Sequence, residues 1–242
     1  MSTYQLTYIL SIIAGAVAVI FIFTPHEYAH ALIAYKSGDG TAKLYGRLTL
    51  NPMKHLDPIG YVMCVLTGFG WAKPVPVNPG NFNHYRRGLF GTAIAGVVTN
   101  YIIAFIAYPI YLCLSLYVLT LPSVRGSQAA YYLLWTVAEI FYLIYAYGMS
   151  VFVFNLLPFR PLDGFRIVES LTRGMNPVRR FLETYGYYIL WFLIIESFVC
   201  RFIYNMFGIT AIQYANVLGY VGWFAQTYVG WPIMKLWGLI IH

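Results

Sequence analysis

The stretch LTYILSIIAGAVAVIFIFTPHEYAH, residues 6–30, decides how this chain is interpreted. Its first part, residues 6–23, is apolar and uncharged, and a helix needs about 20 such residues to cross a bilayer. His26 and His30 follow at a spacing of four, which places them on one helical face. Two imidazoles so placed can bind one metal ion, and Glu27 can take a proton from a metal-bound water. The stretch therefore predicts hydrolysis within or beside a membrane.

The composition of the whole chain agrees with a membrane protein. Of 242 residues, 60% are hydrophobic and only 10% are charged, whereas soluble domains carry about 25% charge. The net charge of +7 comes from lysines and arginines dispersed in loops. This pattern is typical of basic cytosolic loops and argues against a nucleic-acid partner. The expected surroundings are a lipid bilayer, and the N-terminal stretch is interpreted as a retained first span.

Hydropathy along the chain predicts an all-α polytopic membrane protein with about five transmembrane helices. The expected spans lie at about 6–35, 88–119, 131–157, 181–207 and, interrupted by glycines and a proline, 212–241. The apolar segment 59–71 is too short to span and is interpreted as a re-entrant segment. Residues 42–45 and 47–50 flank Gly46 and are expected to form a short β-strand pair near the active site.

The chain is expected to form a single integral membrane domain, residues 1–242, with a core at 6–172 and C-terminal spans at 177–241. Basic residues gather in the segments 36–58, 71–87 and 158–180. Basic loops face the cytosol, so the N-terminus is expected outside and the C-terminus inside. The histidine pair would then lie near the cytosolic face, in a membrane expected to be the prokaryotic cytoplasmic membrane.

The third metal ligand is expected from Asp163, which follows the third apolar segment in NLLPFRPLDG, residues 155–164. That segment ends on the same side as the first, and its two prolines prevent a regular helix. Gly164 allows a tight turn or a close approach. An ordinary ion pair of Asp163 with Arg160 or Arg166 is the alternative.

Three separated motifs carry a resemblance to a known family. They are HEYAH at 26–30, NPMKHLDPIG at 51–60 and NLLPFRPLDG at 155–164. In this order they resemble the site-2 proteases, intramembrane zinc metalloproteases of the M50 group, and most closely the small prokaryotic branch without PDZ or CBS domains. The likeness covers about Phe21 to Ile167. One departure is Val97, which replaces a proline in the family motif that appears here as AGVVTN, residues 95–100.

The resemblance implies a metalloendopeptidase with one zinc ion per chain. The implied metal ligands are His26, His30 and Asp163. Glu27 would be the general base, and Asn155 would steady the substrate backbone or the oxyanion. His55 is counted as a catalytic residue near the metal or the transition state, with a plain interfacial histidine as the alternative. The strand pair and the re-entrant segment would pair with and admit an unwinding substrate helix.

The expected function is hydrolysis of peptide bonds within or near transmembrane segments of membrane proteins, in regulated intramembrane proteolysis or in clearance of signal-peptide remnants. One alternative is a non-proteolytic zinc-binding membrane protein, either a carrier or an inactive helix-binding relative. Glu27 argues against it, because metal binding alone needs no carboxylate there. Another is a membrane zinc protease for soluble or lipidated peptides, with Glu139 or Glu169 as third ligand. Glu196 receives no role, and the oligomeric state is left open.

Overall fold

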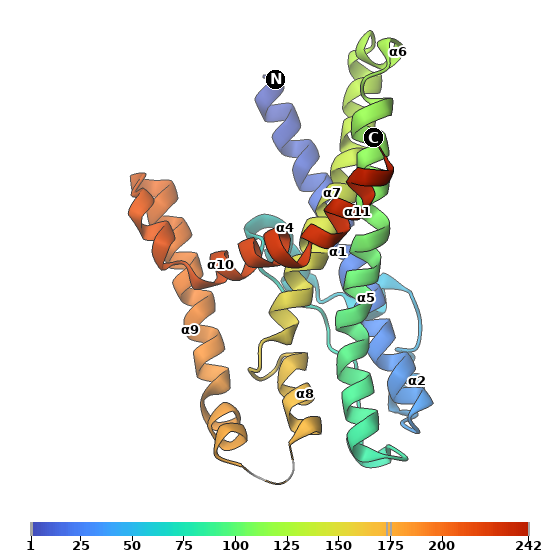
Figure 1. Cartoon of the computed structure of the whole chain (residues 1–242), viewed down its shortest axis with the longest axis vertical. Coiled ribbons are helices and arrows are strands. Elements are labelled where there is room, and N and C mark those ends of the chain that lie inside the picture. Colours follow the sequence, from blue (N-terminus) through green and yellow to red (C-terminus); the bar gives the residue numbers. More distant parts are fainter. Residues whose placement is uncertain (1, 173, 175, 242) are drawn as a thin grey trace.

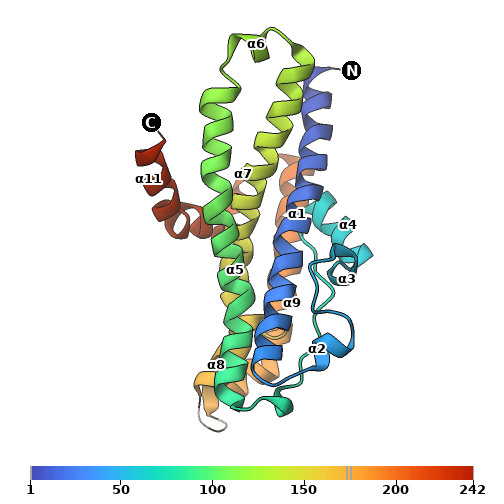
Figure 2. The same cartoon turned by 90° about the vertical axis from the view of Figure 1, so that its right-hand side faces the viewer.

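Four long helices dominate the computed structural model, which describes residues 2–172, 174 and 176–241. They are α1 (Thr3–Lys36), α5 (Tyr85–Cys113), α7 (Gln128–Leu156) and α9 (Pro177–Phe207). By length and composition, each can cross a membrane. Figures 1 and 2 show α1, α5 and α7 packed together along their length, while α9 stands to one side. The chain is thus a helical integral membrane protein.

Small residues let α1 approach its neighbours closely. Ala14, Gly15 and Ala18 are buried on one face of α1, and small side chains at an interface are typical of helices that associate in lipid. Ala18 belongs to a buried cluster that includes Ile144 of α7 and Ala107 of α5. The HEYAH motif, residues 26–30, near the C-terminal end of α1 is therefore held in the three-helix core.

The fifth span predicted at 212–241 is wrong. The described tail consists of short pieces: η3 (Thr210–Ala215), α10 (Val217–Phe224), η4 (Ala225–Val229) and α11 (Trp231–Ile240). Gly208 in the left-handed conformation ends α9, and Pro232 begins a new helix where the fifth span was expected to continue. The described residues therefore contain four candidate spans rather than five.

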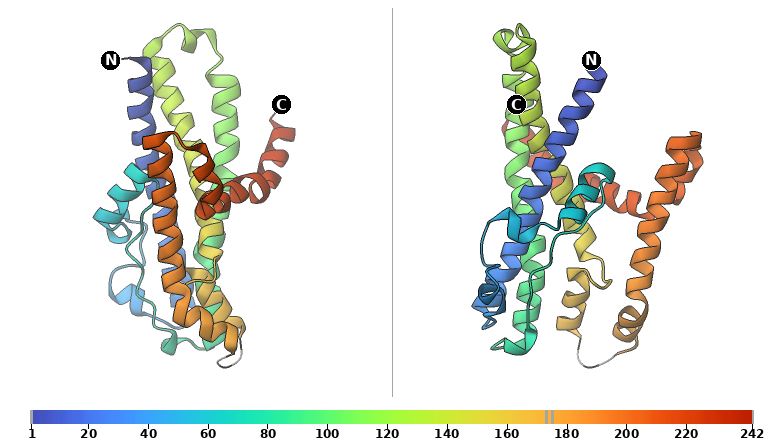
Figure 3. Two further views of the ribbon diagram at one scale, coloured as in Figure 1. Left: turned by 90° about the vertical axis from the view of Figure 1, so that its left-hand side faces the viewer. Right: turned by 180° about the vertical axis from the view of Figure 1, so that it is seen from behind.

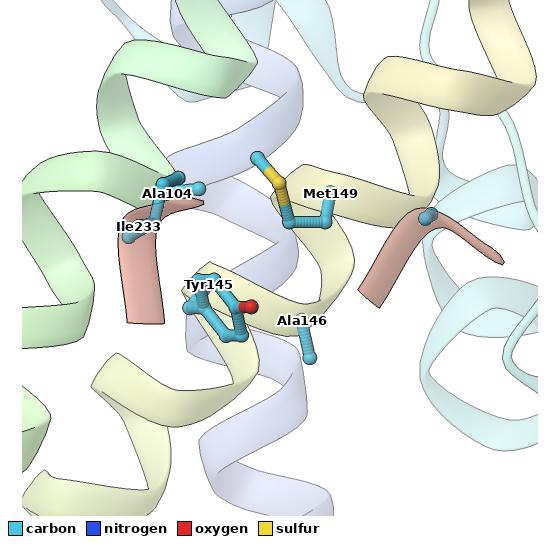
Figure 4. Packing of buried hydrophobic residues seen from close by; sticks show 6 residues of the cluster. Ala104, Tyr145, Ala146, Met149 and Ile233 are labelled. Carbon is cyan, nitrogen blue, oxygen red and sulfur yellow. The ribbon is translucent and has the colours of Figure 1, made fainter. Parts of the chain in front are cut away.

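The tail packs across the bundle instead of crossing the membrane with it. Ala225 and Ile233 are buried against Ala104, Tyr145 and Met149 of α5 and α7 (Figure 4). Figure 3 shows that α9 ends toward the same end of the molecule as the N-terminus, and that the tail then runs back toward the middle of the bundle. Four candidate spans would place the end of α9 on the same side as the N-terminus, whereas the five expected spans would end on the opposite side.

The strand pair predicted at 42–50 is not found among the described residues. Residues 41–44 form a helical turn, α2 (Thr41–Leu44), and 47–50 are irregular. The reason is a long-range network on Asp39: its carboxylate accepts hydrogen bonds from the Thr41 amide, the Asn78 amide and the Asn81 side chain. These contacts favour a turn after Asp39 over an extended chain.

Nearby, residues 72–78 are non-helical, and their prolines favour extended backbone. Ala72 forms an isolated antiparallel bridge with Leu56, and the Lys73 amide donates to the His55 carbonyl at 2.8 Å. Three prolines within 74–79 keep this segment out of a helix. The extended chain at the site therefore follows the re-entrant segment rather than preceding it.

The segment predicted to be re-entrant contains α4 (Pro58–Thr67), after the single turn α3 (Pro52–His55). Ten residues rise only about 15 Å as a helix, half of a bilayer's apolar core. Asp57 caps its start through the Gly60 amide. The Tyr61 hydroxyl donates to the Ala16 carbonyl of α1 at 2.9 Å, which fixes α4 beside the first span.

Candidate metal centre

Three ligand atoms from two helices converge in the interior of the protein. His26 and His30 of α1 are 6% and 5% exposed, and Asp163 is 7% exposed. The two Nε2 atoms are 3.0 Å apart. Asp163 Oδ2 lies 3.4 Å from Nε2 of His26 and 3.1 Å from Nε2 of His30. The structure thus brings together the three residues that the sequence proposed as ligands.

Asp163 reaches this point because the chain turns sharply after α7. Residues 157–162 are irregular, and Asp163 is the first residue of α8 (Asp163–Leu171). Gly164 lies so close to the end of α7 that a Cβ there would be within 2.3 Å of the Leu157 carbonyl oxygen and 2.4 Å of that of Leu156. Only glycine allows this approach, which places the start of α8 against α1 and α5.

The spacing of the three atoms suits a tetrahedral zinc ion. Bonds of about 2.0–2.1 Å at tetrahedral angles place ligand atoms about 3.3 Å apart. The observed separations of 3.0, 3.1 and 3.4 Å bracket that value. Asp163 Oδ2 is buried and accepts no hydrogen bond from the described residues. A cation would be a partner for this oxygen, so the three residues fit a zinc ion.

The charge of Asp163 also suits a ligand. Burial opposes ionisation, but the two adjacent imidazoles outweigh it and hold the pKa of the Asp163 carboxyl well below its ordinary value. The group is therefore a carboxylate at neutral pH. A carboxylate is the form in which Asp163 could bind a metal ion.

One face of α5 packs closely against the two imidazoles. Thr92, Gly96 and Asn100 recur at a spacing of four and therefore share that face. The Thr92 carbonyl lies 2.7 Å from Nδ1 of His30. A Cβ on Gly96 would lie 2.4 Å from Nε2 of His30 and 2.7 Å from Cε1 of His26. The helix can approach the site this closely because residue 96 has no side chain.

Glu27 is held by the extended segment. It is 8% exposed, and its Oε2 accepts a hydrogen bond from the Val75 amide at 2.9 Å. The Val75 side chain is buried with Ala31 of α1 and Ala42 of α2. Arg47, which is also buried, donates to the carbonyls of the two residues before Val75, Lys73 and Pro74. One carboxylate oxygen of Glu27 is thus fixed, and the structure describes no hydrogen bond to the other.

Two further residues predicted to be catalytic lie outside the ligand cluster. Asn155 is half-buried on the last turn of α7, and the described residues form no hydrogen bond with its side chain. His55 is fully buried, and its Nε2 donates to the Thr49 carbonyl at 2.6 Å. Burial lowers the pKa of His55, and the bond to Thr49 only partly offsets this effect. A neutral His55 therefore links the segment before α4 to the loop at Thr49.

Neither alternative third ligand belongs to the cluster among the described residues. Glu169 accepts a hydrogen bond from Arg179 at 2.6 Å, and Glu139 lies on α7 sixteen residues before Asn155. Arg160, the alternative partner of Asp163, pairs with Glu183 at 2.6 Å. Among the described residues, Asp163 has ionic contacts only with the two imidazoles.

Sequence reasoning did not find Thr92, Gly96 or Val75. Thr92 acts through a carbonyl, which every residue has, and Val75 through an amide, which every residue except proline has, so their identity gives almost no signal. Gly96 stood in the motif at 95–100, and its spacing of four from Asn100 was the one available indication.

Comparisons with known proteins agree with this geometry. The family described as "Peptidase family M50" matches residues 14–196. A protein of Bacillus subtilis (strain 168), named "Putative zinc metalloprotease YwhC", is 41% identical over 174 residues, which cover 72% of this chain and 76% of that protein. No solved structure matches the chain.

Proposed function

This chain belongs to peptidase family M50 as a site-2 protease-like metalloprotease, and from that premise we propose that it is a zinc-dependent endopeptidase that cleaves transmembrane segments of other membrane proteins. The observation that carries the proposal is the convergence of His26, His30 and Asp163 in a buried position on a candidate membrane span. A soluble substrate would have to enter the bundle to reach these atoms. A substrate that is itself in the membrane is already at that depth.

The roles of the protein groups follow from their positions. His26, His30 and Asp163 would hold one zinc ion, which supplies Lewis-acid polarisation of the scissile carbonyl and acidifies a bound water. Glu27 would take a proton from the attacking water and return it to the leaving amine. Its Oε2 accepts from Val75, so the other oxygen, Oε1, is the one available for the proton.

Asn155 and His55 complete the proposed site. We assign Asn155 to the substrate backbone or the oxyanion, because its carboxamide has no described protein partner on the last turn before the chain reaches Asp163. His55 is assigned a positioning role, because its carbonyl accepts from Lys73 and its ring binds Thr49. It therefore supports the extended segment that contacts Glu27.

A transmembrane substrate must unwind before attack, because its peptide bonds are enclosed in i→i−4 hydrogen bonds. Unsatisfied backbone groups cost several kcal/mol each in lipid. The extended chain at 72–78 lies beside Glu27 and offers backbone acceptors to an unwound segment. The rival function of a zinc carrier does not need a fixed carboxylate next to the ligands. With the basic loops on the cytosolic side, the site faces the cytosolic half of the prokaryotic cytoplasmic membrane and the N-terminus lies outside.

The test is Glu27→Gln in the purified full chain, in detergent or proteoliposomes, with a panel of single-span substrates. Cleavage should disappear while bound zinc, measured by elemental analysis, stays near one ion per chain. Glu139→Gln is the matched control, since it changes an acid that lies about 24 Å from Asn155 along α7, away from the candidate site. Retained cleavage in Glu27→Gln, or loss of cleavage in both variants alike, would contradict the proposal.

A further inference from the structure

Asn100 is a buried amide in contact with a metal-ligand histidine. It lies on α5, is 0% exposed and meets Nδ1 of His26 at 3.0 Å. As placed, its Nδ2 faces the imidazole, and its Oδ1 is buried without a hydrogen-bond partner among the described residues. Buried polar atoms without partners are rare and costly. The hydrogens on the His26 ring and on the Asn100 carboxamide therefore have to be placed so that the buried oxygen has a partner.

The neighbouring histidine shows what the site requires. Nδ1 of His30 lies 2.7 Å from the Thr92 carbonyl, and a carbonyl can only accept. His30 Nδ1 must therefore carry a hydrogen, which leaves a lone pair on Nε2 of the neutral ring. That lone pair faces Asp163 Oδ2 at 3.1 Å. A backbone acceptor thus fixes His30 in the tautomer that can bind metal.

His26 needs the same tautomer, and it has no backbone acceptor at its Nδ1. The only described partner of this atom is the Asn100 carboxamide. If Nδ2 donated to Nδ1, the ring hydrogen would be on Nε2 and would point at the metal position. If the carboxamide is turned by 180°, Oδ1 accepts from Nδ1–H and the Nε2 lone pair faces the site. The two orientations have nearly the same shape, and the second gives the buried Oδ1 a partner.

We propose that Asn100 is a positioning residue that accepts a hydrogen bond from Nδ1–H of His26 and so holds this ligand in its zinc-binding tautomer. The inference rests on the proposed zinc-dependent function. It assigns α5 a double role on one face, since the Thr92 carbonyl serves His30 and the Asn100 carboxamide serves His26. Gly96, midway between them, leaves the space that both imidazoles occupy.

The test compares two substitutions of nearly equal shape. Asn100→Asp keeps an acceptor and removes the donor, whereas Asn100→Leu removes both. Zinc affinity is measured by competition with a chromophoric chelator on the full chain in detergent. Asn100→Leu should bind zinc 10–100-fold more weakly, and Asn100→Asp should stay within a few-fold of the wild type. Thr99→Val is the control, because the Thr99 hydroxyl bonds only to the Ala95 carbonyl of its own helix.

Each outcome shows whether Asn100 acts as a hydrogen-bond acceptor for His26 or has another role. Equal weakening in the Asp and Leu variants would show that Asn100 acts as a donor or only fills space, and the proposal would be overturned. Wild-type affinity in Asn100→Leu would overturn it as well. If the wild type itself bound no zinc, the proposed function would fail instead, so the two failures are distinguishable.

A second measurement requires no substitution at Asn100. The metal-free wild-type chain is labelled with ¹⁵N-histidine, and the His26 signals are identified by their absence from the spectrum of His26→Gln. The proposal expects the hydrogen of His26 on Nδ1. A hydrogen on Nε2 with none on Nδ1 would mean that Asn100 donates, which contradicts the proposal.

Discussion

Gly96→Ala provides the sharpest test of how closely α5 must approach the ligands. The added methyl would lie 2.4 Å from Nε2 and 2.6 Å from Cε1 of His30, and 2.7 Å from Cε1 of His26. Ordinary contacts between such atoms are about 3.5 Å or longer. Either both rings shift by about 1 Å or α5 moves away by a similar distance. Because the rings are buried, neither movement is free.

The expected magnitudes follow from this displacement. Overpacking of an interior costs about 1–3 kcal/mol of stability, and misplacing catalytic groups by about 1 Å can lower a rate about 10²-fold. Gly96→Ala should therefore cleave a transmembrane substrate about 100-fold more slowly at saturating zinc and bind zinc more weakly. Gly91→Ala is the matched control on the same helix, because its methyl would meet only Ile33 Cγ2, at 3.4 Å.

The assay combines initial cleavage rates in proteoliposomes with chelator competition for zinc. Thermal unfolding in detergent shows how much of the loss is global. If Gly96→Ala matched Gly91→Ala in rate and zinc affinity, the rings would not be confined as the structure indicates, and the reasoning from this close approach would be refuted.

Three further predictions concern neighbouring groups. Asp163→Asn should abolish cleavage and lower zinc affinity at least tenfold by chelator competition, whereas unchanged affinity would exclude it as a ligand. Val75→Pro removes the amide that binds Glu27, so cleavage should fall while bound zinc stays constant; a fall in both would indicate a wider disturbance. The hydrogen bonds to Asp39 outweigh burial and hold its pKa below the ordinary 3.8, so this group stabilises the fold above about pH 4 and loses that contribution as the pH falls through the folded-state pKa. The melting temperature of Asp39→Ala should be lower at pH 7 and depend less on acid than that of the wild type, and a parallel pH dependence would contradict this assignment.

The sequence predicted the family, and the comparisons confirm it. It predicted long apolar helices, because an apolar run that is long enough to cross a bilayer can be recognised from the local sequence alone. The spacing of His26 and His30 fixes a shared face without any tertiary information. Their roles and that of Asp163 remain predictions that the experiments above address, although the structure brings all three side chains together.

The errors arose where distant residues decide local structure. Residues 42–45 alternate in a way that favours a strand, but hydrogen bonds from Asn78 and Asn81 to Asp39 impose a turn there. The apolar tail at 212–241 is long enough to span, yet its interruptions let it fold onto α5 and α7. Neither the Asp39 network nor the buried cluster that includes Ile233 can be seen in a local window of sequence.

The prolines beside Glu27 limit how a peptide could form hydrogen bonds with this segment. Pro74 and Pro76 have no amide hydrogen, and the Val75 amide is already bound to Glu27. A peptide that lies along these three residues therefore meets oxygens alone and can anchor only through its own N–H groups. In the proposed mode of binding, its carbonyls would need donors on the other side of the peptide, which would give a bound substrate a preferred polarity and make N-methylated or proline-containing peptides poor ligands.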